Sequence, residues 1–155
     1  MAETVLTIKG LDELIERFSD APEIVDREID RAMQRSVQKL QTDVKVGTPV
    51  DTGRLRGSIT GQVSGRGLET KGLVGTKVQY APYVEYGTAP HFPPLGALEV
   101  WARRHGKTAW GVALKIAAFG TRPREMFKRA FEKNVGWIQD EFGKVAERIL
   151  EELGK

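Results

Sequence analysis

The sequence predicts an α+β fold in which a small twisted antiparallel sheet packs against two long amphipathic helices. Residues 57–79 are rich in β-branched residues and punctuated by glycine, which is typical of short strands. Apolar residues recur every three or four positions over residues 20–44 and again over 123–153, which predicts the two helices. Extra short helices are expected within 93–120. A chain of 155 residues is expected to form a single domain over its whole length.

Two short elements are predicted before the first long helix. Residues 4–9 are mostly β-branched or apolar and end at Gly10, which predicts a strand. Residues 11–18 carry apolar side chains at helical spacing, which predicts a short helix.

The first long helix has clear signals at both ends. Asp20 is a good N-cap, and Pro22 stands where an amide hydrogen is not needed. Gly47 and Pro49 end the helix. Its apolar stripe, expected to face the core, comprises Ile24, Val25, Ile29, Met33, Val37, Leu40 and Val44.

The predicted sheet contains a hairpin. Residues 58–63 and 68–78 are expected as strands on either side of a tip at 64–67. Glycines at three strand positions predict bulges or sharp twist; they are Gly61, Gly72 and Gly75. Residues 81–86 are expected to form one helical turn that stops at Gly87.

Two helices are predicted in the segment 93–120. Pro93 and Pro94 begin the first, which ends at Gly106. Thr108 is expected to cap the second, which runs through Phe119 to Gly120.

The last long helix is predicted from about Pro123 to Leu153. Its apolar face comprises Met126, Phe127, Ala130, Phe131, Val135, Ile138, Phe142, Val145, Ile149 and Leu150. Gly136 and Gly143 lie inside it and each costs up to about 1 kcal/mol relative to alanine. We expect these glycines to allow the close approach of another backbone.

Charge is distributed unevenly along the chain. Residues 45–130 have a net charge of +9, whereas residues 1–44 have −4 and 131–155 have −2. Three interpretations are open: contact with a phosphate backbone, docking of acidic helices of one copy on the basic surface of another, or a solvated surface without a partner. The candidate DNA-facing cations are Arg54, Arg56, Arg66, Lys71 and Lys77.

Composition excludes several classes of protein. The absence of cysteine excludes a thiolate nucleophile and a Cys-ligated zinc site. No apolar stretch approaches the roughly 20 residues of a membrane helix. The N-terminus lacks the basic start and apolar core of a signal peptide. We therefore expect a soluble protein, made and used without export and without a membrane partner.

No motif supports catalysis. Asp51, Thr52 and Gly53 repeat the triplet of aspartic proteases, but only one such triplet occurs and a turn-like segment precedes it. A simpler interpretation is that Asp51 caps the turn that starts at Thr52. His91 and His105 have no acidic cluster at metal-ligand spacing. We expect no catalytic, metal-binding or cofactor-binding residue and no small-molecule substrate.

Three segments together resemble a known family. The first is residues 48–59, TPVDTGRLRGSI, and the second is residues 74–88, VGTKVQYAPYVEYGT. The third and looser one comprises His91 to Pro94, Trp101, Gly120 with Thr121, and residues 123–127. Their order and spacing resemble the tail-completion family (neck, or minor tail proteins) of long-tailed phages and prophages, over about residues 20–131.

The resemblance implies a structural virion protein without catalytic activity. It implies a ring of copies, sixfold by analogy with long tails, at the neck between head and tail. The implied partners are a head-closure or connector protein on one side and a tail terminator or tail tube protein on the other. The extra helices of 93–120 are expected to be an insertion that reaches a neighbour.

The resemblance also assigns structural roles to its motif residues. Those of the first segment are expected to make the turn that launches the sheet; they are Pro49, Asp51, Thr52, Gly53 and Arg54. Leu55 and Ile59 are expected to enter the core. Those of the second segment are expected to lie on a short helix and turn near a subunit boundary, or else to pack the monomer only; they are Tyr80, Tyr83, Glu85, Tyr86 and Gly87.

An alternative function remains open at this point. The basic middle of the chain would also suit a protein that binds DNA without sequence preference, because phosphate contacts need only positive charge. The two functions are compatible, since a ring at the head–tail junction surrounds the exiting genomic DNA.

Overall fold

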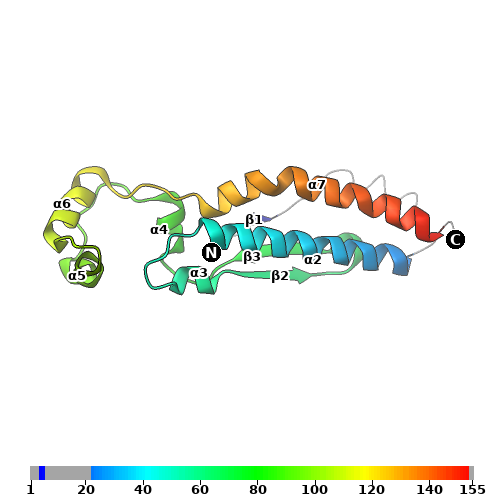
Figure 1. Cartoon of the computed structure of the whole chain (residues 1–155), viewed down its shortest axis with the longest axis horizontal. Helices are drawn as coiled ribbons and strands as arrows, with labels where there is room; N and C mark the ends of the chain where they lie inside the picture. Colours follow the sequence, from blue (N-terminus) through cyan, green and yellow to red (C-terminus); the bar gives the residue numbers. More distant parts are fainter. Residues whose placement is uncertain (1–3, 6–21, 154–155) are drawn as a thin grey trace.

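The computed structural model describes residues 4–5 and 22–153, with the side chains of 22–151. The elements, in chain order, are β1 (Thr4–Val5), α2 (Pro22–Gly47), α3 (Arg54–Ser58), β2 (Thr60–Ser64), the 3-10 helix η1 (Gly67–Glu69), β3 (Lys71–Gly75), α4 (Ala81–Tyr86), α5 (Leu95–Arg104), α6 (Ala109–Phe119) and α7 (Met126–Leu153). The molecule is elongated: α2 and α7 run side by side, the sheet lies along α2, and α5 and α6 project from one end (Figure 1). The predicted α+β class, with a small antiparallel sheet and two long helices, is confirmed.

The sheet has the order β1-β3-β2, and both pairings are antiparallel. The register of β2 and β3 is regular from Thr60 opposite Gly75 to Ser64 opposite Lys71, so the predicted bulge is absent from this ladder. Gly61 serves a different purpose, because a Cβ there would collide with Val37 of α2.

Gly72 has the same role on the neighbouring strand. A Cβ added there would come within 2.6 Å of Val37 and 2.7 Å of the sulfur of Met33. Glycine at these two strand positions lets the first long helix pack directly on the sheet.

The observed strands begin later than predicted, and β3 also ends earlier, because residues at these ends form local turns with their own hydrogen bonds. Ser58, expected to begin the first strand, instead ends α3, and its Oγ donates to Leu55 O at 2.7 Å within that turn. The amide of Thr70 donates to Gly67 O at 3.1 Å, which closes η1 before β3 begins. After β3, Thr76 Oγ1 accepts a hydrogen bond from the amide of Val78 at 3.2 Å. These turns compete with the ladder for backbone groups.

The core lies between α2, α7 and the sheet. The predicted stripe of α2 is buried, apart from Ile24, which is half-buried, and Leu55 and Ile59 enter the core as expected. Burial of each large side chain contributes about 1.5 to 3 kcal/mol. On α7 the predicted face is correct except for Leu150, which is 59% exposed. Ile149 occupies the inward position, and the next residue lies about 100° further round the helix.

A network of ion pairs, in which the carboxylates are buried and the arginines are partly exposed, also joins the two long helices. The carboxylate of Glu28, 4% exposed, accepts hydrogen bonds from Arg31 at 2.6 Å and from Arg148 of α7 at 3.1 Å. Arg148 also reaches Glu141 at 3.4 Å, and Glu141 pairs with Arg35 of α2. Burial opposes ionisation of Glu28, but the arginines around it prevail and lower its pKa. The network fixes the register of α2 against α7.

The remaining expectations divide as follows. The predicted strand 4–9 is present at its first described residues as β1, whereas the helix 11–18 and the cap at Asp20 lie outside the described residues. The last helix begins at Met126 rather than Pro123, because residues before it pair with another segment. Within the described chain, a Cβ on Gly136 or Gly143 would meet nothing within 4 Å, so the expected close backbone is absent there.

Candidate interaction surfaces

The turn at residues 48–53 connects α2 to α3. Thr48 is buried: its hydroxyl donates to Val44 O at 2.6 Å and lies 3.3 Å from the sulfur of Met126. Gly53 has φ of 80°, a left-handed conformation that favours glycine. Pro49 between them is exposed. A turn is present at these residues, but it leads into α3, which includes Arg54, before the sheet begins at Thr60. Thr48 anchors the turn to α7.

The predicted cap by Asp51 is wrong. In the structure Thr52 Oγ1 accepts the hydrogen bond from the amide of Arg54 at 3.4 Å, and the side chain of Arg54 is exposed. Asp51 turns instead towards α5, where its carboxylate accepts a hydrogen bond from Arg104 at 3.1 Å. Asp51 therefore pairs with Arg104 on a distant segment rather than with the local backbone, and no sequence spacing indicates this pairing.

The side chain of Glu85 is buried and caps α7. Its two carboxylate oxygens accept hydrogen bonds from the amides of Phe127 and Lys128, each at 3.1 Å. The backbone reinforces this contact, since the amide of Glu125 donates to Glu85 O at 3.1 Å. A carboxylate is well placed here because the first amides of a helix lack intrahelical partners and carry partial positive charge. Glu85 therefore ties α4 to the start of α7.

We call residues 88–125 the arm: two extended segments with α5 and α6 between them. At its base Thr88 and Thr121 form an isolated antiparallel bridge, with amide-to-carbonyl distances of 3.2 Å in both directions. Gly87 has φ of 72° and Gly120 has φ of 67°, and a Cβ on either would collide with the opposite backbone. These two glycines are required for the chain to leave and re-enter the body side by side.

Three tyrosines lie at the same end of the molecule. Tyr80 precedes α4, and Tyr83 and Tyr86 lie on it with 63% and 70% of their surface exposed. The expected helical turn is therefore present, and it presents aromatic side chains outward while Glu85 points inward. Exposed tyrosines are typical anchors of protein interfaces.

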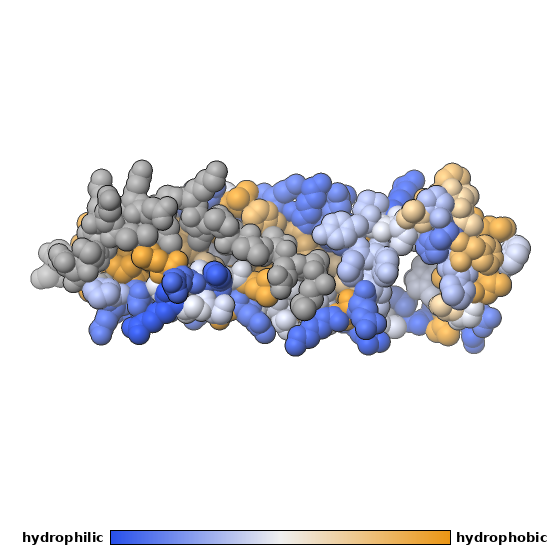
Figure 2. Space-filling view, turned by 180° about the vertical axis from the view of Figure 1, so that it is seen from behind, coloured by the Kyte–Doolittle hydropathy of each residue, from blue (hydrophilic) through white to orange (hydrophobic). Residues whose placement is uncertain are grey.

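The arm has a small interior and a large apolar exterior. Its buried residues are Pro93, Ala102 and Ala113, none of which belongs to the main core cluster. The large apolar side chains left exposed on it are Phe92, Val100, Trp110, Leu114 and Phe119. Figure 2 shows hydrophobic residues gathered over the arm at the right-hand end. Sequence reasoning missed these residues as candidates. The available signal was α6, which has a single charged residue in 11 and would normally be buried on most sides.

The five candidate DNA-facing cations are exposed, but they form two separate groups. Arg66 and Lys71 lie near the hairpin tip, where Arg66 pairs with Asp26 at 2.7 Å. Arg54 and Arg56 on α3, with Lys77 after β3, lie at the opposite end of the strands. Five strand residues separate the groups, about 16 Å. The predicted cations therefore do not make one continuous basic patch.

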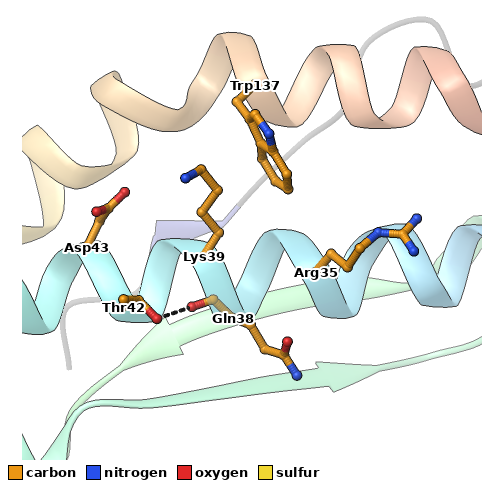
Figure 3. A pocket seen from close by; sticks show the side chains of 6 residues that line it. All are labelled: Arg35, Gln38, Lys39, Thr42, Asp43 and Trp137. Atoms are coloured by element: carbon orange, nitrogen blue, oxygen red, sulfur yellow. Dashed lines mark hydrogen bonds between the residues drawn. The ribbon is translucent and has the colours of Figure 1, made fainter.

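A shallow groove of about 350 Å³ lies between the long helices. Figure 3 shows its lining, with Trp137 on α7 facing the α2 side chains Arg35, Gln38, Lys39, Thr42 and Asp43. Lys39 Nζ lies 5.2 Å from the centre of the Trp137 ring. Among these residues none is a nucleophile paired with a base.

The described residues contain no group of three or more His, Asp or Glu that could hold a metal ion. His91 and His105 bond backbone carbonyls through Nδ1, and His105 stacks on Trp101 with ring centres 4.2 Å apart. No helix in the described part of the chain is long and apolar enough to cross a membrane. The surfaces that stand out are thus the tyrosines and the arm, which are suited to contact with macromolecules.

Comparison with known proteins points in the same direction. Residues 12–87 match the model of one protein family, described as "Bacteriophage HK97-gp10, putative tail-component". Comparisons with curated proteins and with solved structures gave no match. The matched residues include the turn at 48–59 and α4, and they end at Gly87, where the arm begins. Residues 12–87 are therefore similar to the HK97-gp10-like family of phage tail components.

Proposed function

We propose that this chain is a structural protein that completes the tail of a phage and joins it to the head at the neck. The observation that carries the proposal is the family match, because it covers the first of the three segments that resemble tail-completion proteins and residues 74–87 of the second. In this role the protein has no catalytic activity. It works in the virion, after assembly in the host cytoplasm, by contact with other virion proteins.

The proposal gives the protein three kinds of neighbour. Copies of the same chain form a ring, sixfold where the tail is sixfold. A head-closure or connector protein lies on one side of the ring and a tail terminator or tail tube protein on the other. The elongated body and the apolar arm support such a role, since both offer surface beyond what the monomer's own core uses (Figure 1).

We further propose that residues 1–155 act as one tail-completion domain into which residues 93–120 are inserted. Two observations support this organisation. The family match stops at Gly87, and the main core cluster takes no residue from the arm. The turn of Pro49 to Arg54 and the tyrosines of α4 then belong to the shared part, where contacts common to the family are expected.

The alternative of a DNA-binding protein receives less support. Its candidate cations are divided between the two ends of the hairpin, and Arg66 is engaged by Asp26. A ring that surrounds DNA needs only scattered positive charge on its lumen, so contact with genomic DNA is compatible with the neck role.

Mass spectrometry and immunogold labelling of purified virions test the proposal. We expect the chain in intact particles, in a fixed number of copies, with label at the junction of head and tail. Absence of the chain from purified virions, or label along the whole tail, contradicts a neck function.

A further inference from the structure

We propose, building on the neck function above, that the arm of one copy docks on the acidic end of α2 and α7 of a second copy of the same chain. The acidic end comprises residues 22–31 and 137–151. The contact is head-to-tail, so it uses a different surface on each of the two copies.

The first argument is the exposed apolar surface of the arm. Trp110 and Phe119 are 57% and 79% exposed, and Phe92 packs against Trp110 with ring centres 5.7 Å apart. The fully buried residues of the arm are small, namely Pro93, Ala102 and Ala113, so its large side chains leave much of their apolar surface open to another molecule. Clustered apolar side chains of this kind mark an interface.

The second argument is charge. The arm carries six Lys/Arg and two Asp/Glu, a net charge of +4, whereas the acidic end carries eight Asp/Glu and four Lys/Arg, a net charge of −4. The two regions lie at opposite ends of the elongated molecule (Figure 1). The arm therefore cannot reach the acidic end of its own chain, and only another copy brings the opposite charges together.

The third argument is that the charges at both regions are available. Within the described chain, no ion pair engages the exposed arm residues Arg103, Lys115, Arg122 and Arg124, or the exposed acidic residues Glu23, Asp140, Glu147 and Glu151. Single exposed pairs contribute only about 0 to 1 kcal/mol each. In the proposed contact, ion pairs between the two regions orient the arm, and burial of apolar surface supplies most of the affinity.

Leu150 gives the acidic end an apolar contact point. It is 59% exposed on α7, among the free carboxylates of Glu147 and Glu151. An exposed apolar side chain on an acidic helix end complements an arm that carries exposed aromatic residues and a net positive charge.

Contacts at the base of the arm fix its orientation relative to the rest of the molecule. The bridge between Thr88 and Thr121 joins its two extended segments, and Arg104 ties α5 to Asp51 at 3.1 Å. Glu85 fixes the adjoining start of α7. A fixed arm presents the same surface in every copy, which a closed ring of heterologous contacts requires.

Cross-linking in assembled particles tests the contact, and the chain suits this because it contains no cysteine. Phe119→Cys is combined in turn with Glu147→Cys, Leu150→Cys and Glu151→Cys, and virions are treated with a short bismaleimide. We expect at least one pair to give a ladder at multiples of the 17.2 kDa chain. Each single variant serves as a control, as does Phe119→Cys with Gln62→Cys, which places the second cysteine on exposed β2.

The remaining outcomes overturn the inference in distinguishable ways. If the chain is present in virions but no acidic-end pair gives a ladder, the arm does not dock there, while the neck function stands. If Phe119→Cys links instead to a different virion protein, that protein is the partner of the arm. If the chain is missing from virions, the proposed function falls and the docking inference with it.

Charge reversal gives a second measurement on the pair that cross-links. Arg103→Glu with Lys115→Glu should weaken the ladder at least tenfold, and adding Glu23→Lys with Asp140→Lys, which leaves the cysteine positions untouched, should restore at least half of it. Failure of the second exchange to restore the ladder, in variants that remain in virions, contradicts direct pairing of the two regions.

Discussion

The carboxylate of Glu85 lies over the first turn of α7, where one of its oxygens accepts the amide hydrogen of Phe127 at 3.1 Å. The other oxygen accepts the backbone amide hydrogen of Lys128. A single buried side chain thus satisfies two amides that have no partner within the helix. The contact joins α4, which carries the exposed tyrosines, to the longest helix of the molecule.

Glu85→Gln should lower the free energy of unfolding by about 1 to 2 kcal/mol, because an amide nitrogen then faces one of the two backbone amides. Urea unfolding measures the loss, and hydrogen exchange should quicken at Phe127 and Lys128. Glu99→Gln, on the exposed surface of α5, is the matched control and should change little. Equal stability of the two variants would show that the cap is unimportant.

Gly120→Ala should disrupt the base of the arm. Gly120 has φ of 67° and ψ of −159°, a region that essentially only glycine occupies, and a Cβ there would collide with the carbonyl of Thr88. The cost is about 1 to 3 kcal/mol. Hydrogen exchange across residues 88–125 should quicken in this variant.

Gly96→Ala is the corresponding control. It lies in α5 with nothing within 4 Å of the added Cβ, so alanine should stabilise this helix by about 1 kcal/mol. Slower exchange in Gly120→Ala than in Gly96→Ala would contradict the assignment of a glycine-dependent bridge.

Acid should weaken the joint between α2 and α7. The pKa of Glu28 is lowered below its usual 4.5, against the effect of burial, by the hydrogen bond and charge of Arg31 and by the charges of Arg148 and Arg27. A carboxyl with a lowered folded pKa stabilises the fold above its unfolded pKa, and this contribution is lost as pH falls below about 4.5. The unfolding free energy should therefore decline in that range, by at most about 1.4 kcal/mol per pH unit for this one group.

Glu28→Gln should have a shallower decline with pH than the parent protein, because the titrating carboxyl is gone. Denaturant unfolding at a series of values between about pH 3 and pH 6 gives the free energy of unfolding of both proteins as a function of pH. Glu132→Gln, exposed on α7, should retain the parental slope. An unchanged slope in Glu28→Gln would remove this network from the account of stability.

The free protein should bind duplex DNA weakly. A genuine nonspecific binder loses affinity with a log–log salt slope of about −0.9 per phosphate contact. Because the candidate cations are divided between two ends of the hairpin, we expect no measurable binding near physiological salt. Fluorescence anisotropy with labelled DNA measures this. Tight, salt-sensitive binding that is lost in Arg56→Ala with Lys77→Ala would favour the DNA-binding alternative.

Periodicity predicted the long helices well, because burying an apolar stripe decides their position. The stripe from Val25 to Val44 shows this. A capping signal was also correct, because the hydroxyl of Thr108 accepts a hydrogen bond from the amide of Gly111 at the start of α6. Local signals were sufficient wherever the decisive contact is local.

The errors arose where a distant segment supplies the partner. Asp51 meets Arg104 and Glu85 meets the start of α7, and neither contact has a sequence spacing that could be recognised. The glycines of the sheet were interpreted as signs of bulges or sharp twist, whereas Gly61 and Gly72 make room for α2, a helix that is distant in the sequence. For the candidate site, the sequence identified the motif segments, whereas the exposed face of the arm required the three-dimensional structure.

Electron microscopy of lysates from a phage that lacks this gene tests the central claim most directly. We expect DNA-filled heads beside separate or malformed tails, restored to whole particles by the gene supplied in trans. Intact and infectious particles in the absence of the gene would contradict a role in completing the tail and joining it to the head.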